Sequence, residues 1–206
     1  MNVVFDFAGV LFAWDPLALL QRLLPEQATD GASARVLVAD FFQAYEGDWS
    51  EFDRGTLSAA ELAPRIARRT GIALADVLRV IAAVPLDFQP MAPMLTLMNR
   101  LRDRGNRLFY LSNMPVPYAT LLETKHAFVR DFEAGVFSSR VHLIKPEPGI
   151  FAHALKSFGI DAHDTLFIDD MPANTQAARR AGWQALDFLN AAQCEAELSR
   201  LGLVLA

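Results

Sequence analysis

The chain has 206 residues, of which 52% are hydrophobic, and a formal net charge of −5. This length can bury a full core as one domain or as one domain with an insertion, and the acidic balance supplies no basic field for nucleic acid. No apolar stretch reaches the length of a membrane-spanning helix, and the single cysteine, Cys194, excludes an internal disulfide. Because no signal peptide is visible at the N-terminus, we expect a soluble cytoplasmic protein with neither a membrane nor a nucleic-acid partner.

The first predicted element is a buried strand over residues 2–5, which leads into Asp6 and then into a small-residue turn at Ala8-Gly9. The carboxyl ends of parallel strands are where open α/β sheets place their ligands, in a crevice that backbone N–H groups can also reach. A single aspartate at a strand end is more often a turn or capping residue. The assignment of Asp6 to a functional site therefore depends on the polar residues farther along the chain.

The stretch from residue 15 to residue 89 has a helical pattern throughout. Asp15-Pro16 is a helix start, and Ser58 with Glu61 has the spacing of a capping box. Pro64 is expected to kink or shorten the helix that contains it. The predicted helices cover residues 16–24, 31–46, 58–70 and 74–84.

The second half alternates between helices and strands. A helix is predicted from Met91 to Gly105, followed by strands over 107–113, 136–139, 164–170 and 183–188 and by helices over 117–130, 149–158, 174–181 and 190–201. This alternation predicts an α/β fold with a doubly wound parallel sheet. The helical block interrupts it, so we expect a core domain of residues 1–14 and 90–206 and an inserted helical cap of residues 15–89. The crossings near 13–16 and 86–92 would be the hinge.

Polar residues gather where the predicted strands end. They are Asp6, Ser112-Asn113, Lys145 (in a loop) and Asp169-Asp170. Each alone has an ordinary explanation as a helix cap, a solvated lysine or a turn. Together they lie on one sheet edge, where converging carboxylates repel unless a cation is present, and carboxylate oxygens suit Mg²⁺. A hydroxyl, backbone amides and a lysine suit a phosphate, so the set predicts magnesium-assisted phosphoryl transfer with a carboxylate available as nucleophile.

Four segments carry a family resemblance. They are Asp6-Phe-Ala-Gly-Val-Leu, Leu111-Ser-Asn113, Lys145-Pro-Glu-Pro, and Phe167-Ile-Asp-Asp170 with Asn174. These segments resemble the four motifs of the haloacid dehalogenase (HAD) superfamily, and the helical insert after the first motif fits as well. The branch is similar to the capped sugar-phosphate phosphatases of the glucose-1-phosphatase type. The resemblance implies a Rossmann-like fold and a hydrolase that is a phosphoric monoester phosphatase.

For the phosphate, the resemblance implies that Asp6 is the nucleophile and forms an aspartyl-phosphate. Ser112 would bind the phosphoryl oxygens with help from the backbone amide of Asn113. Lys145 would neutralise charge on nucleophile and phosphate, and the turn at Gly9 would bring the backbone close to the phosphate.

For the metal, the resemblance implies Mg²⁺ as the cofactor. Asp6 and the backbone carbonyl of Ala8 would be ligands, with Asp170 as the principal further carboxylate. Asp169 would be another ligand or would lie just behind the ligands, and Asn174 would orient the metal carboxylates or their waters.

The chain departs from the family pattern at Ala8. Most HAD phosphatases have an aspartate there, two residues after the nucleophile, which protonates the leaving group and later activates water. Losing such help typically costs about 10²–10⁴-fold in rate. We therefore expect a preference for good leaving groups, such as the anomeric oxygen of a sugar 1-phosphate or an aryl phosphate.

Three functions stay open. The leading one is a magnesium-dependent phosphatase of a small phosphorylated metabolite, with a sugar phosphate as one candidate. The second is a 2-haloacid dehalogenase, which needs no metal, and the adjacent Asp169-Asp170 argues against it. The third is a catalytically weak binding or regulatory protein of the same fold. The sequence leaves open whether the chain is a monomer or a homodimer.

Substrate choice is expected to lie in the cap. Trp14, Asp15, Trp49, Phe52 and Arg54 are the residues that could face the site there. Aromatic residues of a small helical cap more often form its own core, and Arg54 before Gly55 is more often a solvated turn residue. None of the five is assigned as a substrate ligand.

Overall fold

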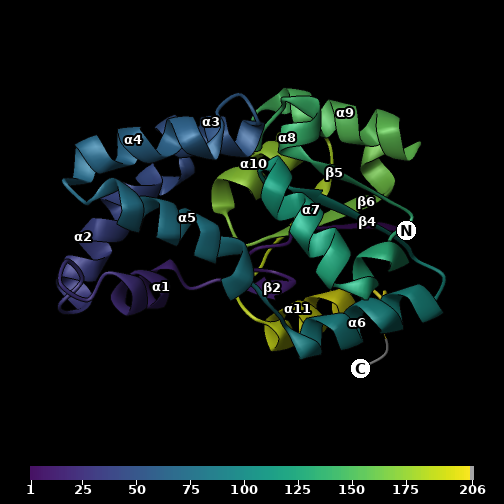
Figure 1. Ribbon diagram of the computed structural model, residues 1–206. Coiled ribbons are helices and arrows are strands. Elements are labelled where there is room, and N and C mark those ends of the chain that lie inside the picture. The colour runs from purple at the N-terminus through teal and green to yellow at the C-terminus, as the bar shows by residue number, and fades with distance from the viewer. Residues whose placement is uncertain (205–206) are drawn as a thin grey trace.

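In the computed structural model, which describes residues 1–204, the sheet is parallel and has five strands in the order β5-β4-β1-β6-β7 (Figure 1). The strands are β1 (Asn2–Phe5), β4 (Arg107–Ser112), β5 (Ala134–Phe137), β6 (Thr165–Asp169) and β7 (Gln184–Asp187). The first strand is central, with Phe5 paired to Tyr110 on one side and to Ile168 on the other. The expected parallel α/β fold is confirmed, and the central position of β1 puts Asp6 between two strand ends.

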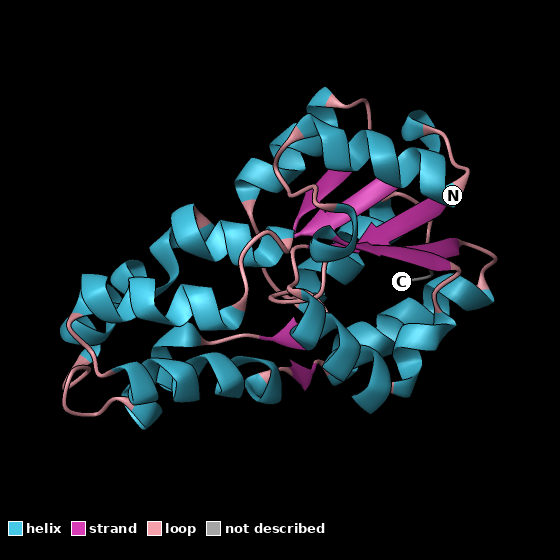
Figure 2. Ribbon diagram, turned by 45° about the horizontal axis from the view of Figure 1, so that its top comes forward, coloured by secondary structure: helices cyan, strands magenta, loops and turns pink. Residues whose placement is uncertain are grey.

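Helices cover both faces of the sheet, as the two views show (Figures 1 and 2). They are α6 (Ala92–Asp103), α7 (Val116–Lys125), α9 (Pro148–Phe158), α10 (Pro172–Arg180) and α11 (Ala191–Arg200), with short turns at α8 (Ser138–Val141), η2 (Ala127–Asp131) and η3 (Ala162–Asp164). Val3 and Phe5 pack in the core cluster that includes residues of α6, α7 and α11, whereas Val4 packs in the cluster that includes residues of α9 and α10. Successive residues of β1 therefore serve opposite faces, as strand geometry requires.

A helical cap follows the first strand and forms a lobe beside the sheet (Figure 1). It consists of α1 (Pro16–Leu23), α2 (Gly31–Phe42), the 3₁₀ turn η1 (Gln43–Tyr45), α3 (Gly47–Arg54), α4 (Ala59–Thr70) and α5 (Leu74–Asp87). Its two connections to the core form a ribbon, in which β2 (Phe12–Ala13) pairs antiparallel with β3 (Gln89–Pro90). One apolar cluster continues from the sheet into the cap, so the cap shares its core with the domain beneath it.

The structure corrects three expectations in the cap. The helix predicted over 31–46 ends at Phe42, because Gln43, Ala44 and Tyr45 all have φ between 51° and 62°, in the left-handed region. A helix that the pattern did not predict, α3, follows this turn. The helix α4 runs through Pro64 and is not shortened by it.

The capping box of α4 is as predicted, with the Ser58 hydroxyl accepting from the Glu61 backbone N–H and the Glu61 carboxylate accepting from the Ser58 backbone N–H. Among the helices of residues 1–204, each is too short or too polar to cross a membrane.

Candidate active site

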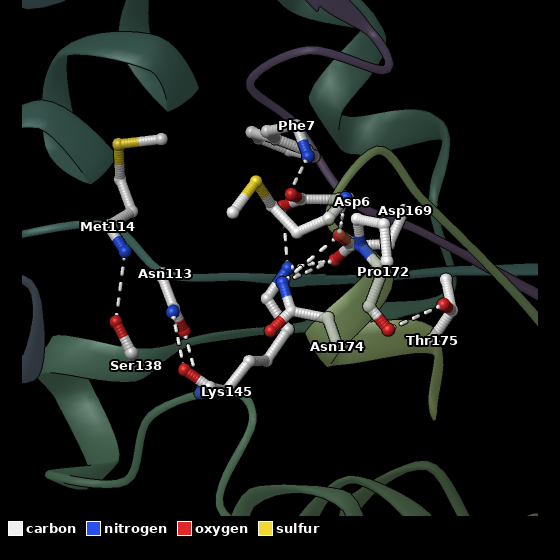
Figure 3. A network of polar contacts seen from close by, with 11 residues as sticks. Asp6, Phe7, Asn113, Met114, Ser138, Lys145, Asp169, Pro172, Asn174 and Thr175 are labelled. Atoms are coloured by element: carbon white, nitrogen blue, oxygen red, sulfur yellow. Dashed lines mark hydrogen bonds and ion pairs between the residues drawn. The ribbon is translucent and has the colours of Figure 1, made fainter. Parts of the chain in front are cut away.

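Lys145 lies at the centre of the residues predicted from the strand ends (Figure 3). Its side chain is buried, with Nζ 3.0 Å from Asp6 Oδ1 and donating to Asp169 Oδ2 at 2.6 Å. The Asn113 side chain fixes the backbone of this lysine from both sides, because its Oδ1 accepts from Lys145 N at 2.9 Å and its Nδ2 donates to Lys145 O at 3.0 Å. The alternative of a solvated surface lysine is therefore excluded, and both polar groups of the Asn113 side chain hold the backbone of Lys145.

The Asp169 carboxylate is fully buried and hydrogen-bonded from three directions. Besides Lys145, it accepts from Asn174 Nδ2 at 3.0 and 3.1 Å and from the backbone N–H of Met171 at 2.8 Å. Bonds of this number hold a buried carboxylate in one orientation. Asn174 thus orients a carboxylate, as expected for it.

Asp6, Asp169 and Asp170 bring carboxylate oxygens within 4.8 Å of one another, which is the geometry of a cation site. Burial raises the pKa of Asp6 to about 7, Lys145 opposes this, and the charges of Asp169 and Asp170 add to it. Burial likewise raises the pKa of Asp170 to about 6, with the charge of Asp169 as the next cause. Hard oxygen donors that repel one another in this way fit Mg²⁺, whose charge would favour the ionised forms.

The turn after Asp6 must be tight. Gly9 has φ +80°, and a Cβ at this position would lie 2.3 Å from Asp170 Oδ2. Its N–H donates to Phe12 O at 2.8 Å, so this amide is already occupied and Gly9 serves the site by leaving room for Asp170. Ala8 borders the cavity as its sequence position predicts, and its methyl group offers no acid or base there.

Ser112 ends β4 beside this cluster. Its side chain is buried, and its Oγ has no hydrogen-bond partner among the described residues. A buried hydroxyl without a partner is costly, and a phosphoryl oxygen would satisfy it. A phosphate-binding role for Ser112 stays a prediction, because the residue has a free hydroxyl but is not among those that line the cavity.

A single cavity joins this cluster to the cap. Its lining includes Asp6, Ala8, Lys145 and Asp170 from the core. The rest of its wall is mostly aromatic or aliphatic: Trp14, Ala44, Tyr45, Trp49, Val84, Phe88, Met114, Pro115, Tyr118 and Met171. The Trp14 indole N–H donates to the Tyr45 hydroxyl at 2.7 Å, which satisfies the only polar group of the Trp14 side chain. A ligand in this cavity would meet the carboxylates and Lys145 at the core end and a mostly apolar wall at the cap end, where Glu46 and Asp53 are the acidic exceptions.

The model of the haloacid dehalogenase-like hydrolases matches residues 1–182 of this chain. The chain belongs to this hydrolase family. The expected Rossmann-like α/β fold, helical cap and hydrolase class are thereby confirmed.

Three relatives illustrate the range of the family. The sesquiterpene phosphatase astK of Aspergillus oryzae is 25% identical over 96% of this chain and 94% of its own. The HAD family enzyme bt-2542 of Bacteroides thetaiotaomicron, in complex with magnesium and inorganic phosphate, superposes with a TM-score of 0.70 at 24% identity over 90% of this chain and 92% of its own. L-2-haloacid dehalogenase of Xanthobacter autotrophicus, with chloropropionic acid covalently bound, superposes with a TM-score of 0.67 at 17% identity over 97% and 82%. The two structures establish the fold of the chain.

In this HAD-like hydrolase, the five cap residues singled out from the sequence have different places. Trp14 and Trp49 line the cavity. Asp15 caps α1 by accepting from Ala18 N, Phe52 is buried against Tyr118, and Arg54 forms an ion pair with Glu147 of the core.

Sequence reasoning missed the one carboxyl group that the cap buries in this cavity, that of Asp53. The signal was present, because Asp53 follows Trp49 by four residues and the two therefore share a helix face. It was overlooked because α3 itself was not predicted.

Proposed function

We propose that the chain is a magnesium-dependent phosphatase that acts through an aspartyl-phosphate on Asp6. The observation that carries this proposal is the convergence of three carboxylates and one buried lysine at the end of a cavity. Carboxylates that repel one another around a lysine have no role in apolar packing, whereas a metal and a phosphate would balance their charge.

Asp6 is built to attack with one particular oxygen. Its Oδ1 accepts from the Phe7 backbone N–H at 2.7 Å and lies 3.0 Å from Lys145 Nζ, which leaves Oδ2 for the phosphorus. Lys145 and the Ser112 hydroxyl would bind the phosphoryl oxygens as their charge develops. The amide of Asn113 would be a further donor.

Asp6, Asp170 and the Ala8 carbonyl would hold Mg²⁺, with Asp169 behind them or as a further ligand. When bound, this ion would polarise the phosphoryl group and shield its charge from the nucleophile. The bonds that Asp169 accepts from Lys145, Met171 and Asn174 favour the position behind the ligands, because its oxygens are already occupied.

The helical block of residues 15–89 would act as the cap that selects the substrate, over a core of residues 1–14 and 90–206. The part of the cavity wall that it supplies is mostly apolar, which favours a phosphate monoester with an apolar organic group over a sugar phosphate. The relative that is named a sesquiterpene phosphatase points in the same direction. Small phosphorylated molecules of this class are the substrates that we propose.

The test is phosphate release from a panel that contains p-nitrophenyl phosphate, benzyl phosphate, a prenyl phosphate and glucose 1-phosphate. Each would be measured with Mg²⁺, with EDTA, and with the variants Asp6→Asn and Asp40→Asn. Asp40 is an exposed cap aspartate, so Asp40→Asn controls for the substitution itself. We expect Mg²⁺-dependent turnover that falls by about 10³-fold or more in Asp6→Asn, as for loss of a nucleophile.

The panel also separates the alternatives. Faster turnover of glucose 1-phosphate than of the apolar esters would contradict the proposed substrate class. Chloride release from 2-haloacids without metal, and no phosphate release, would identify a dehalogenase instead. Absence of both reactions would leave the binding protein.

A further inference from the structure

The carboxyl group of Asp53 is buried in the cavity without a partner. The residue is 6% exposed and lines the same cavity as Asp6, Ala8 and Lys145. No described residue forms a hydrogen bond or ion pair with its carboxyl oxygens, and this includes Asp6, Asp169, Asp170 and Lys145. A buried carboxyl group without a partner destabilises a fold if it is charged, so its presence calls for a function.

The backbone of Asp53 is fastened to the core. The Ser138 hydroxyl donates to the Asp53 carbonyl and accepts from the Met114 backbone N–H at 2.9 Å, which ties the end of α3 to the loop after β4. At the next residue, the Arg54 guanidinium donates twice to the Glu147 carboxylate. A Cβ at Gly55 would lie 2.6 Å from the Ser139 carbonyl, which shows how closely this part of the cap approaches α8.

These contacts join the end of α3 to the core, and Asp53 lines the same cavity as the nucleophile. Asp53 and Ala8 both line this cavity, but Asp53 belongs to the cap and Ala8 to the loop after β1. The only other cap carboxyl group that lines the cavity in the described part of the chain is that of Glu46, which is exposed to solvent.

We propose that Asp53 is the general acid and base of this enzyme, and that the cap thereby supplies the proton transfer that Ala8 cannot. This inference rests on the proposed phosphatase function. In the first half-reaction, Asp6 Oδ2 bonds to phosphorus, the bond from phosphorus to the leaving oxygen breaks, and Asp53 gives its proton to that oxygen. In the second, the Asp53 carboxylate takes a proton from the water that attacks phosphorus, the bond to Asp6 breaks, and phosphate leaves.

The electrostatic surroundings agree with this role. The pKa of Asp53 is raised to about 8, mainly by burial and next by the charge of Asp6, with the charge of Lys145 acting in the opposite direction. Tyr45 and Tyr118, the other titratable groups coupled to it, have pKa values raised by burial and stay neutral. Asp53 is therefore protonated near neutral pH before the reaction, as a general acid must be.

The experiment compares two aromatic esters of similar size, p-nitrophenyl phosphate with a good leaving group and benzyl phosphate with a poor one. The variants are Asp53→Asn, Asp40→Asn and the double variant Ala8→Asp/Asp53→Asn, each with Mg²⁺. The readouts are kcat/KM, which reports the step that expels the leaving group, and the pre-steady-state release of p-nitrophenolate.

We expect Asp53→Asn to lower kcat/KM about 100-fold or more for benzyl phosphate and less than about tenfold for p-nitrophenyl phosphate, because only the poor leaving group needs the proton. It should also produce a burst of p-nitrophenolate equal to the enzyme concentration, since the aspartyl-phosphate then waits for a base. Ala8→Asp should restore most of the activity on benzyl phosphate, and Asp40→Asn should behave as wild type.

Equal losses on the two esters without a burst would overturn the proposal, because a structural defect has no reason to distinguish leaving groups. Wild-type rates in Asp53→Asn would overturn it as well, and would leave the phosphatase itself standing. If the wild-type chain shows no phosphate release that depends on Asp6, the proposed function fails and this inference fails with it.

Discussion

Two walls of one cavity treat a buried carboxyl group in opposite ways. On the sheet edge, Asp169 is enclosed by bonds from Lys145, Asn174 and the Met171 amide. On the cap wall, the carboxyl group of Asp53 receives no hydrogen bond from the described residues. The first carboxyl group is held in one orientation by its donors, whereas the second has no donor among the described residues. This difference is the observation on which the proposed role of the cap in proton transfer rests.

The largest expected effect on stability concerns Lys145, which pairs with the carboxylates of the sheet edge. Lys145→Met would leave Asp6 and Asp169 buried without their cation, and removal of one partner of a buried pair costs about 3–5 kcal/mol. We expect a loss of this size in the free energy of unfolding, measured with urea. Lys156→Met, at an exposed position of α9, is the control and should change it little. Recovery of stability in Lys145→Met/Asp169→Asn would confirm that the stranded charge is the cause.

The space beside Asp170 can be tested through Gly9. Gly9→Ala forces a side chain into a left-handed conformation and into the Asp170 carboxylate, which we expect to cost about 1–3 kcal/mol. Gly105 has nearly the same φ, +79°, and a methyl group added there would have nothing within 4 Å, so Gly105→Ala controls for the backbone alone. Equal unfolding free energies of the two variants would show that Asp170 moves aside without cost.

The missing partner of Asp53 predicts a stabilising substitution. Asp53→Asn should raise the unfolding free energy by about 1–4 kcal/mol at neutral pH, because a neutral amide replaces a carboxyl group that folding keeps from ionising, and each unit of pKa shift corresponds to about 1.4 kcal/mol. The folded chain keeps this proton up to a pH of about 8, whereas the unfolded chain releases it near 3.8. Wild-type stability therefore falls relative to Asp53→Asn as the pH rises through this window.

The measurement is thermal unfolding of both proteins from pH 5 to pH 8, with Asp40→Asn beside them. Asp6 titrates in the same window and its charge acts on Asp53, so the difference between the two proteins reports the Asp53 proton together with its effect on Asp6. A difference that shrinks with rising pH would contradict the buried, proton-retaining position of this residue.

The smallest expected effect on stability concerns the ion pair between Arg54 of the cap and Glu147 of the core. The pair between Arg54 and Glu147 is largely exposed at the glutamate, so Arg54→Gln should cost less than about 1 kcal/mol of stability. It should nevertheless lower kcat on poor leaving groups, because the residue beside Arg54 would lose its position. Arg65→Gln removes a pair with Asp48 that lies inside the cap, and it should leave kcat unchanged. Equal kcat values for the two variants would show that this pair does not position Asp53.

The sequence predicted the core wall far better than the cap wall. Asp6, Ser112 and Asp169 follow or end buried strands, and parallel strands bring their carboxyl ends to one edge regardless of detail. The sequence could not show that Asp169 is enclosed while Asp170 is more exposed, because both follow the same strand pattern. That distinction comes from Asn174 and Lys145, which approach from other elements.

Predicting the cap wall required recognising a turn that the residue types do not indicate. Gln43, Ala44 and Tyr45 adopt positive φ without glycine, which sequence patterns seldom reveal. The predicted helix therefore continued past Phe42 and concealed the start of α3. Because α3 was not predicted, the sequence did not indicate that Trp49 and Asp53 share a helix face. Their four-residue spacing shows this only once the helix is known.

The ribbon of β2 and β3 makes the helical insert a cassette with adjoining ends, since Ala13 and Gln89 are paired neighbours. An exchange of this insert between related hydrolases would therefore join the chains at adjoining positions, and the new cap would have to match the apolar cluster that continues into the core. A graft of this kind would also remove Asp53, so a chimera built on this core needs an acid from the new cap or an aspartate in place of Ala8. If Asp53 supplies the proton as proposed, a new cap changes both the substrate range and the proton transfer, and the two have to be designed together.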